Sequence, residues 1–218
     1  MTSQAKPAAN RGTLLLADIS GYTAFLEGVG AAHGEEMAET GEVPEAYPIM
    51  MRLLDGIVER LVPPFTLSKT EGDAVFAFAP DSDLPLRGQS LLACMSGCYA
   101  AFQENVVAMG RALTCGCSAC SFGITLDLKF VMHHGGYVIQ AIAGRQELLG
   151  PDVNAAHRLL KNHAADVVGN RAYALFTRSA ADHLEIPVAT ATPITETYDH
   201  LAPIETFVFP VPFDQPIA

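Results

Sequence analysis

Residues 13–25 read TLLLADISGYTAF, and the rest of the chain is best understood from this segment. Thr13 to Ala17 form a continuous apolar run with the length of a buried strand. Asp18 follows this run directly, Ser20-Gly21 marks a turn, and the residues through Phe25 suit the start of a helix. The segment therefore predicts a buried strand that carries a carboxylate at its C-terminal end.

A second carboxylate follows a predicted hairpin. Two short strand candidates, Phe65 to Lys69 and Ala74 to Ala79, flank the turn Thr70-Glu71-Gly72, which leads into Asp73. If the two strands are neighbours, Asp73 and Asp18 converge at one edge of the sheet. A pair of Mg²⁺ ions is usually held by one or two carboxylates together with substrate phosphates. The alternative is that one aspartate caps a helix and the other stabilises a turn.

The remaining periodicities predict helices and strands around one core. Helical spacing from Ile49 to Leu61 ends at Pro63-Pro64, and a longer amphipathic helix covers Gln89 to Leu113. Residues 29–42, rich in Gly, Ala and Glu, are predicted to form a loop. The other expected elements are strands Leu126–His133 and Tyr137–Ala143 joined by Gly135-Gly136, a loop 144–151, a helix from Asp152, a strand Ala172–Phe176, a helix Ser179–Leu184 and a strand Glu205–Phe209.

Composition limits the classes of protein and partner. With 218 residues, half of them apolar, we expect a single α/β domain over residues 12–218 after a disordered tail, 1–11. The absence of a long apolar run and of a signal peptide predicts a cytoplasmic protein without membrane association. A net charge of −11 with only 13 Lys and Arg argues against a nucleic acid polymer as partner, while a single nucleotide remains compatible with it.

The cysteines suggest a second kind of chemistry. Their number, five, is odd and no secretion signal is present, so a disulfide framework is not expected. Cys115, Cys117 and Cys120 lie within six residues and form a candidate zinc or redox cluster that needs a fourth ligand. His133 and His134 are the candidate partners, and plain turn thiols with structural histidines are the alternative.

Four segments in order resemble class III adenylyl and guanylyl cyclases, in particular a divergent group of stand-alone bacterial cyclase-homology proteins. The segments are LADISGYTAF at 16–25, KTEGD at 69–73, LKFVMHHGG at 128–136 and GPDVNAAHRL at 150–159. The resemblance implies an α/β (α+β) fold of the ferredoxin-like, palm type, with a central, mostly antiparallel sheet flanked by helices.

The resemblance also implies roles for individual residues. Asp18 and Asp73, with the carbonyl group of Ile19, would hold two Mg²⁺ or Mn²⁺ ions per site. Asn154 would orient the ribose, and Arg158 would neutralise charge that develops at the α-phosphate. For Asn154 and Arg158 the alternatives are a helix cap and a surface residue.

Three further residues would contact the substrate. Lys69 and Glu147 align with the residues that select the base, and a lysine donor with a carboxylate acceptor favours adenine and therefore ATP. Lys129 stands where the family often has a phosphate-binding arginine. In this family the residues at positions 69, 147, 154 and 158 face the metals of the other protomer, so the resemblance implies a head-to-tail homodimer.

One departure from the family concerns the phosphates. The family carries a lysine just before its final strand, whereas residues 197–203 read TYDHLAP, in which only His200 can become cationic.

The leading prediction is a metal-dependent nucleotidyl cyclase that converts a nucleoside triphosphate to the 3′,5′-cyclic nucleotide and pyrophosphate. The alternatives are a nucleotide-binding sensor with weak or no catalysis, and a thiol- or zinc-regulated interaction protein.

Overall fold

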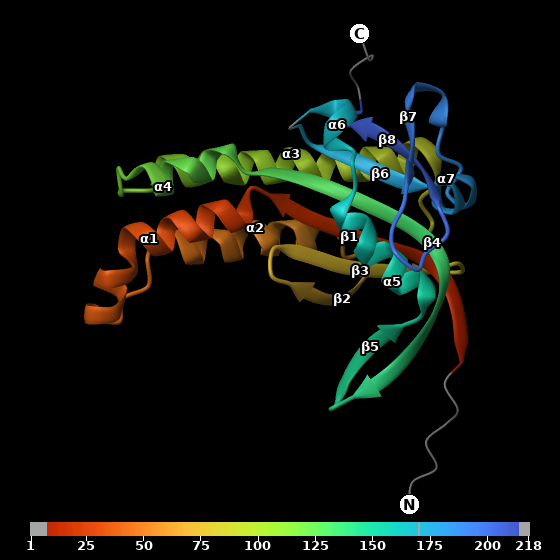
Figure 1. Ribbon diagram of the computed structural model, residues 1–218, viewed down its shortest axis with the longest axis horizontal. Coiled ribbons are helices and arrows are strands. Elements are labelled where there is room, and N and C mark those ends of the chain that lie inside the picture. The colour runs from red at the N-terminus through yellow and green to blue at the C-terminus, as the bar shows by residue number, and fades with distance from the viewer. Residues whose placement is uncertain (1–7, 170, 214–218) are drawn as a thin grey trace, which may run out of the picture.

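The computed structural model describes residues 8–169 and 171–213, which form one mixed sheet with helices on its faces (Figure 1). The sheet order is β2-β3-β1-β4-β6-β8-β7, and β5 pairs with β4. Every pairing is antiparallel except that of β4 with β6. The predicted mostly antiparallel sheet flanked by helices is therefore confirmed.

Most of the helices and strands predicted from the sequence are present in the structure. The strands are β1 Ala9–Ser20, β2 Thr66–Glu71, β3 Ala74–Pro80, β4 Asp127–Ile142, β5 Arg145–Leu149, β6 Tyr173–Thr177, β7 Thr192–Glu196 and β8 Ile204–Pro210. The helices are α1 Tyr22–Thr40, α2 Ala46–Leu61, α3 Gly88–Ala112, α4 Ser118–Phe122, α5 Pro151–Arg158, α6 Ala165–Val168 and α7 Arg178–His183, with 3₁₀ turns at Gly123–Thr125, Leu159–Lys161 and Val188–Thr190.

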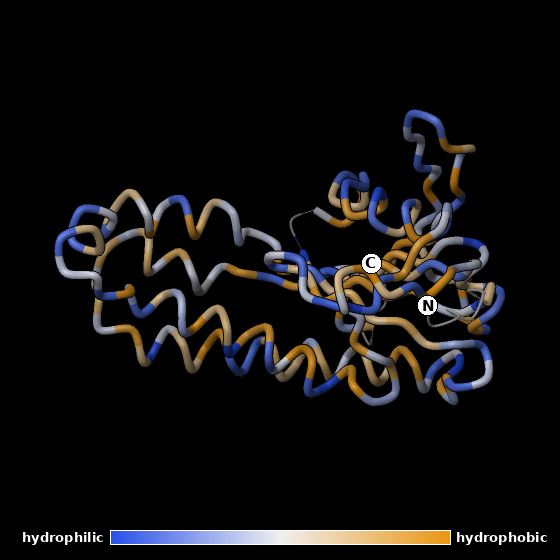
Figure 2. Tube along the Cα trace, turned by 90° about the horizontal axis from the view of Figure 1, so that it is seen from below, coloured by the Kyte–Doolittle hydropathy of each residue, from blue (hydrophilic) through white to orange (hydrophobic). Residues whose placement is uncertain are grey.

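The two faces of β1 belong to two hydrophobic cores. Leu15 and Ala17 pack in the larger core with α1, α2 and α3, whereas Leu14 and Leu16 pack in a smaller core with α5. The hydropathy colouring in Figure 2 alternates along the long helices, as expected for helices with one buried side. Because side chains alternate along a strand, Asp18 is on the same face as Leu14 and Leu16, the face that only the short helices cover.

The predicted loop 29–42 is wrong over most of its length, because α1 continues to Thr40. Glycine lowers helix propensity, which is why this segment reads as a loop. Tertiary packing outweighs that penalty: Phe25 and Val29 are buried in the larger core. A Cβ atom on Gly28 would lie 3.2 Å from Cβ of Ala119, so this glycine lets α1 approach α4 closely.

The strands predicted at 126–133 and 137–143 are one continuous strand, β4, so the predicted turn at Gly135-Gly136 is wrong. A Cβ atom on Gly135 would overlap the carboxylate of Asp152, and the N–H of Gly136 donates to Asp152 Oδ2 at 2.6 Å. Gly135 therefore makes room for Asp152 on α5, and Gly136 donates its N–H to that carboxylate, so the pair does not form a turn.

The chain reverses instead at Ala143-Gly144, where both residues have positive φ, and β5 occupies most of the predicted loop 144–151. The strand β7 was not predicted; it is an edge strand and contains Pro193, a residue that is usually confined to edges and strand ends.

The N-terminal boundary also differs from the prediction. Residues 9–11 of the predicted tail belong to β1, while residues 1–7 lie outside the described residues. Within the described part of the chain, none of the helices combines the length and hydropathy needed to cross a bilayer.

Candidate functional site

The register of the sheet brings the two aspartates together. Asp18, near the end of β1, pairs with Ala74 at the start of β3, so Asp73 immediately precedes the residue opposite Asp18. The N–H of Ile19 donates to the carbonyl oxygen of Asp73 at 3.2 Å. Burial and the nearby charge of Asp18 raise the pKa of Asp73. Two acidic groups thus share one partly buried place beside the backbone of Ile19.

Lys129 supplies the positive charge at this place. It lies directly opposite Asp18 in β4, and its Nζ is 2.7 Å from Asp18 Oδ2. Burial would lower the pKa of Lys129, but the hydrogen bond and the charge of Asp18 outweigh it and raise the pKa. Lys129 was predicted to contact phosphate, and in this structure its ammonium group is paired with Asp18.

A second group of charges joins β2, β5 and α5. Lys69 Nζ is 2.9 Å from Glu147 Oε2 and 3.0 Å from Glu71 Oε1, and these two hydrogen bonds raise the pKa of Lys69. Burial would raise the pKa of Glu71, but Lys69 and the nearby His157 lower it. His157 Nε2 is 3.0 Å from Glu71 Oε2, and its Nδ1 is 2.8 Å from the carbonyl oxygen of Val153. The structure therefore brings Lys69 and Glu147 together and connects them to the helix that carries Asn154.

The residues predicted to act in catalysis line an open pocket of about 520 Å³. Asn154 and Arg158 come from α5, and the facing wall comes from the segment between β7 and β8. The lining is Asn154, His157, Arg158, Lys161, Asp199, His200 and Leu201. His200, from the segment between β7 and β8, therefore lies in the same pocket as Arg158.

Lys161 is a functional candidate that the sequence reasoning missed. It follows Arg158 by three residues, in the 3₁₀ turn that continues α5, and it lines the same pocket. Residues three apart on a helix lie on one side, so the spacing was a usable signal. Lys161 therefore adds a second basic side chain to the pocket beside Arg158.

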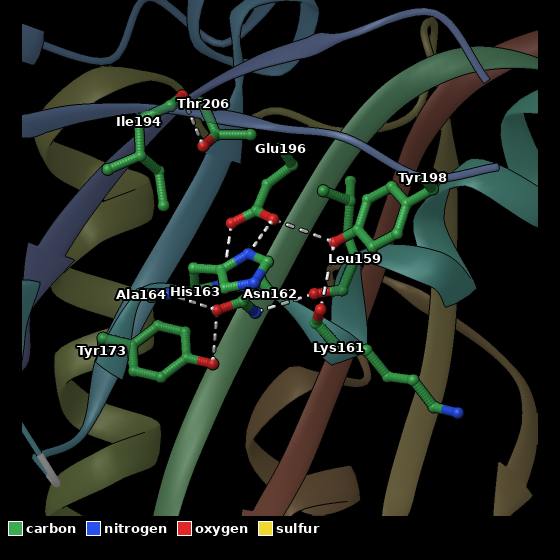
Figure 3. A network of polar contacts seen from close by, with 10 residues as sticks. All are labelled: Leu159, Lys161, Asn162, His163, Ala164, Tyr173, Ile194, Glu196, Tyr198 and Thr206. Atoms are coloured by element: carbon green, nitrogen blue, oxygen red, sulfur yellow. Dashed lines mark hydrogen bonds and ion pairs between the residues drawn. The ribbon is translucent and has the colours of Figure 1, made fainter. Parts of the chain in front are cut away.

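A buried carboxylate holds the β7–β8 segment against this pocket (Figure 3). Glu196, at the end of β7, is fully buried and accepts from the backbone N–H of His163 at 2.8 Å. Its other oxygen lies 2.8 Å from His163 Nδ1 and 3.3 Å from the hydroxyl of Tyr198. The network fixes residues 162–164, just after Lys161, to the strand that leads to His200.

Replacing Glu196 with leucine should lower the free energy of unfolding by about 1–3 kcal/mol, because the backbone N–H of His163 and the hydroxyl group of Tyr198 lose the buried carboxylate that accepts from them. Denaturant unfolding measures this change. Glu205→Leu, on the neighbouring strand β8, is the matched control; Glu205 is exposed and paired with Arg178, so its loss should cost clearly less than the loss of Glu196. Equal losses in both variants would contradict an anchoring role for Glu196.

The same network predicts a pH dependence. The hydrogen bond to Glu196 raises the pKa of His163 above its unfolded value. Its contribution to stability is therefore complete below about pH 6.5 and is lost as the pH rises through the raised pKa. Unfolding midpoints followed against pH for the wild type and His163→Gln should converge at alkaline pH.

The predicted zinc partners are wrong. His133 lies within hydrogen-bonding distance of Thr177 and Asp152, and His134 of Asp81. The three cysteine sulfurs instead surround His33 of α1. A hydrogen bond from the Cys120 N–H lowers the pKa of Cys117 to about 6, whereas burial raises the pKa of Cys120 to about 12.

The candidate residues thus form separate groups within one chain. The first group consists of Asp18, Ile19, Asp73 and Lys129. Lys69 and Glu147 belong to the second group, and Asn154 and Arg158 line the pocket. His157 connects these two, because it contacts Glu71 and also lines the pocket. Among the described residues, no hydrogen bond or ion pair joins the first group to Asn154 or Arg158.

The sequence matches proteins whose function is not described. A family model for "Protein of unknown function (DUF2652)" matches residues 50–167. The uncharacterized protein Rv2561/Rv2562 of Mycobacterium tuberculosis is 29% identical over 163 residues, which cover 72% of this chain and 71% of that protein.

Solved structures show where the fold recurs. The adenylyl cyclase CyaB from P. aeruginosa superimposes with a TM-score of 0.60 at 14% identity, covering 94% of this chain and 95% of that one. The guanylyl cyclase Cya2 gives 0.60 at 14% identity, covering 98% and 100%. A bacterial light-regulated adenylyl cyclase gives 0.61 at 14% identity over 94% of this chain, which spans about half (53%) of that one. The fold is therefore that of adenylyl and guanylyl cyclases.

Proposed function

The chain belongs to the family described as a protein of unknown function (DUF2652), and we propose that it is a metal-dependent nucleotidyl cyclase that acts as a homodimer. In this reaction the ribose 3′-oxygen loses its proton and attacks the α-phosphorus of a nucleoside triphosphate, and pyrophosphate leaves. The observation that carries the proposal is the juxtaposition of Asp18 and Asp73 beside Ile19, within a cyclase-like fold.

The residues at this place suit two Mg²⁺ or Mn²⁺ ions. Carboxylate and carbonyl oxygens are the ligands that such ions prefer, and Asp18, Asp73 and the carbonyl group of Ile19 offer three of them. Burial and, after it, the charge of Asp18 raise the pKa of Asp73, and a bound cation would counter both effects. When bound, the ions would activate the 3′-hydroxyl group and neutralise the triphosphate. Lys129 would move from Asp18 to a phosphate oxygen.

Lys69 and Glu147 would recognise the base. Their side chains are already in contact, so a donor and an acceptor stand side by side. Adenine presents an acceptor, N1, next to a donor, its amino group, and matches this pair. ATP is therefore the proposed substrate.

Exchanging the two side chains, Lys69→Glu with Glu147→Lys, should reverse the preference. Guanine presents a donor at N1 and an acceptor at O6, so the exchanged pair matches it. We expect the ratio of kcat/KM for ATP over GTP to fall at least about tenfold, as measured by product formation with each triphosphate. An unchanged ratio would show that these residues do not select the base.

Arg158 and Lys161 would hold the triphosphate. The guanidinium group of Arg158 suits charge that develops at the α-phosphate, and Asn154 would orient the ribose. Lys161 lines the same pocket and would supply the cation that residues 197–203 lack, with His200 contributing when it is protonated.

A homodimer would unite the separate groups. The first group of one chain would face Asn154 and Arg158 of the other, as in the head-to-tail arrangement that the resemblance implies. The surface beside Lys69 and Glu147 supports a covered interface: Leu67, Ile142 and Leu149 are 38%, 48% and 40% exposed. They lie on β2 and on the β4–β5 hairpin, which projects from the body of the molecule in Figure 1.

The test is a comparison of four nucleoside triphosphates. The purified dimer would be incubated with Mn²⁺ or Mg²⁺ and each triphosphate, and the products separated by chromatography. Cyclic nucleotide formed from ATP in preference to the others is the expected result. Failure to form cyclic product from any of the four would contradict the proposal.

A nucleotide-binding sensor is the second candidate. The ion pair between Lys129 and Asp18 occupies the place of the metals, and residues 197–203 contain no lysine. Calorimetry that detects metal-dependent nucleotide binding without cyclic product would favour this candidate over the enzyme.

A further inference from the structure

Four metal-binding side chains converge at the end of the molecule where α1 and α4 lie together (Figure 1). His33 Nε2 is 3.5 Å from Cys115 Sγ, 3.4 Å from Cys117 Sγ and 3.5 Å from Cys120 Sγ. All four ligand atoms lie within 4.8 Å of one another. His33 comes from α1, Cys115 and Cys117 from the segment that joins α3 to α4, and Cys120 from α4 itself.

The distances are those expected around a tetrahedral ion. Zn–S bonds of about 2.3 Å and a Zn–N bond of about 2.0–2.1 Å, at tetrahedral angles, place nitrogen and sulfur about 3.6 Å apart. The three observed separations, 3.4–3.5 Å, agree with this value. The sequence C-x-C-x₂-C also contains the C-x₂-C spacing of many zinc sites.

Hydrogen bonding alone does not account for this geometry. An imidazole nitrogen has either one hydrogen or one lone pair, so it makes one good hydrogen bond, whereas three sulfurs surround Nε2 at nearly equal distances. All three thiols are free. A cation at the centre of the four atoms would satisfy every one of them.

The groups around the four ligands also suit a metal. The N–H of Cys120 donates to Cys117 Sγ at 3.3 Å, a contact that stabilises a thiolate. Glu36 Oε2 lies 3.8 Å from Nδ1 of His33, on the side where metal-binding histidines commonly meet a carboxylate.

We propose that His33, Cys115, Cys117 and Cys120 bind one structural Zn²⁺ ion. Four protein ligands leave no open position, so the ion would have a structural and not a catalytic role. It would fasten α1, which begins just after Asp18 and Ile19, to the segment that leads through α4 into β4 and Lys129. This site is independent of the proposed cyclase activity.

The experiment measures metal in the full chain prepared without a polyhistidine tag. Elemental analysis after gel filtration should find about one zinc per chain. His33→Ala and Cys120→Ser should each reduce the retained zinc at least about tenfold. Chelation should lower the unfolding temperature of the wild type and leave that of Cys120→Ser unchanged.

Two controls locate the ion. Cys94→Ser removes a thiol outside the cluster, and Asp81→Asn alters the other group of metal-binding side chains, Asp81 with His134 and His183. Both variants should retain zinc like the wild type. Loss of zinc from Asp81→Asn combined with retention by His33→Ala would overturn the proposal.

A ligand exchange keeps the test decisive if His33→Ala does not fold. His33→Cys preserves four ligands and should retain the metal. With Co²⁺ in place of zinc, its sulfur-to-cobalt absorption should exceed that of the wild type by about one third, since four thiolates replace three. Wild-type protein that takes up neither zinc nor tetrahedral cobalt, or that forms a disulfide among these cysteines, would contradict the assignment.

Discussion

Replacing both Asp18 and Asp73 with asparagine is expected to lower cyclic nucleotide formation by about 10³-fold or more. Asparagine keeps the size of each side chain but removes the charges proposed to hold the two ions, and such ions supply several kcal/mol of transition-state stabilisation. Initial rates at saturating triphosphate and Mn²⁺ give the comparison. Thermal unfolding checks that the variant still folds.

The control for this loss is Asp81→Asn. Asp81 and Asp73 flank the same strand, β3, at opposite ends, but Asp81 contacts His134 and His183 and not the proposed metal site. The control should keep wild-type activity. A double variant that folds and still forms product at the wild-type rate would remove the aspartates from the mechanism.

Two inactive variants are expected to restore activity when they are combined. In a head-to-tail dimer of Asp73→Asn with Arg158→Ala, one site carries both substitutions and the other carries neither. Random pairing makes about half of the dimers mixed, each with one intact site of two, so about one quarter of wild-type activity should return. Co-expression with two different tags allows the mixed dimer to be isolated and assayed.

The matched control combines two variants of the same group. Asp18→Asn mixed with Asp73→Asn leaves a defective metal site in every arrangement, so no activity should return. Failure of the Asp73→Asn and Arg158→Ala pair to recover, although mixed dimers are present, would show that the site does not lie between two chains.

The sequence predicted those parts of the fold that depend on local patterns. The strand that carries Asp18, the hairpin whose turn contains Asp73 and the helices α2 and α3 are confirmed, because their periodicity and turn residues lie within short segments. The errors arose where contacts between residues distant in sequence determine the local structure. Gly135 and Gly136 read as a turn, but Gly135 leaves space for Asp152 from a later helix and Gly136 donates its N–H to it.

The candidate site shows the same division. The sequence predicted that Asp18 and Asp73 converge at one edge of the sheet, and the register brings them together. It assigned Lys69 and Glu147 to one role, base selection, and their side chains are in contact. His33 was not foreseen, because it lies more than 80 residues from the cysteines and inside a segment that reads as a loop. Only the packing of α1 against α4 brings it to them.

The most direct test of the cyclase proposal is the identity of the product that the wild-type dimer makes from ATP and Mn²⁺. Mass spectrometry distinguishes the cyclic monophosphate from the linear one, which is heavier by one water, and chromatography identifies the 3′,5′ isomer. The account predicts 3′,5′-cyclic AMP and pyrophosphate in equal amounts. Linear AMP or ADP alone, or unchanged ATP despite metal-dependent binding, would contradict it.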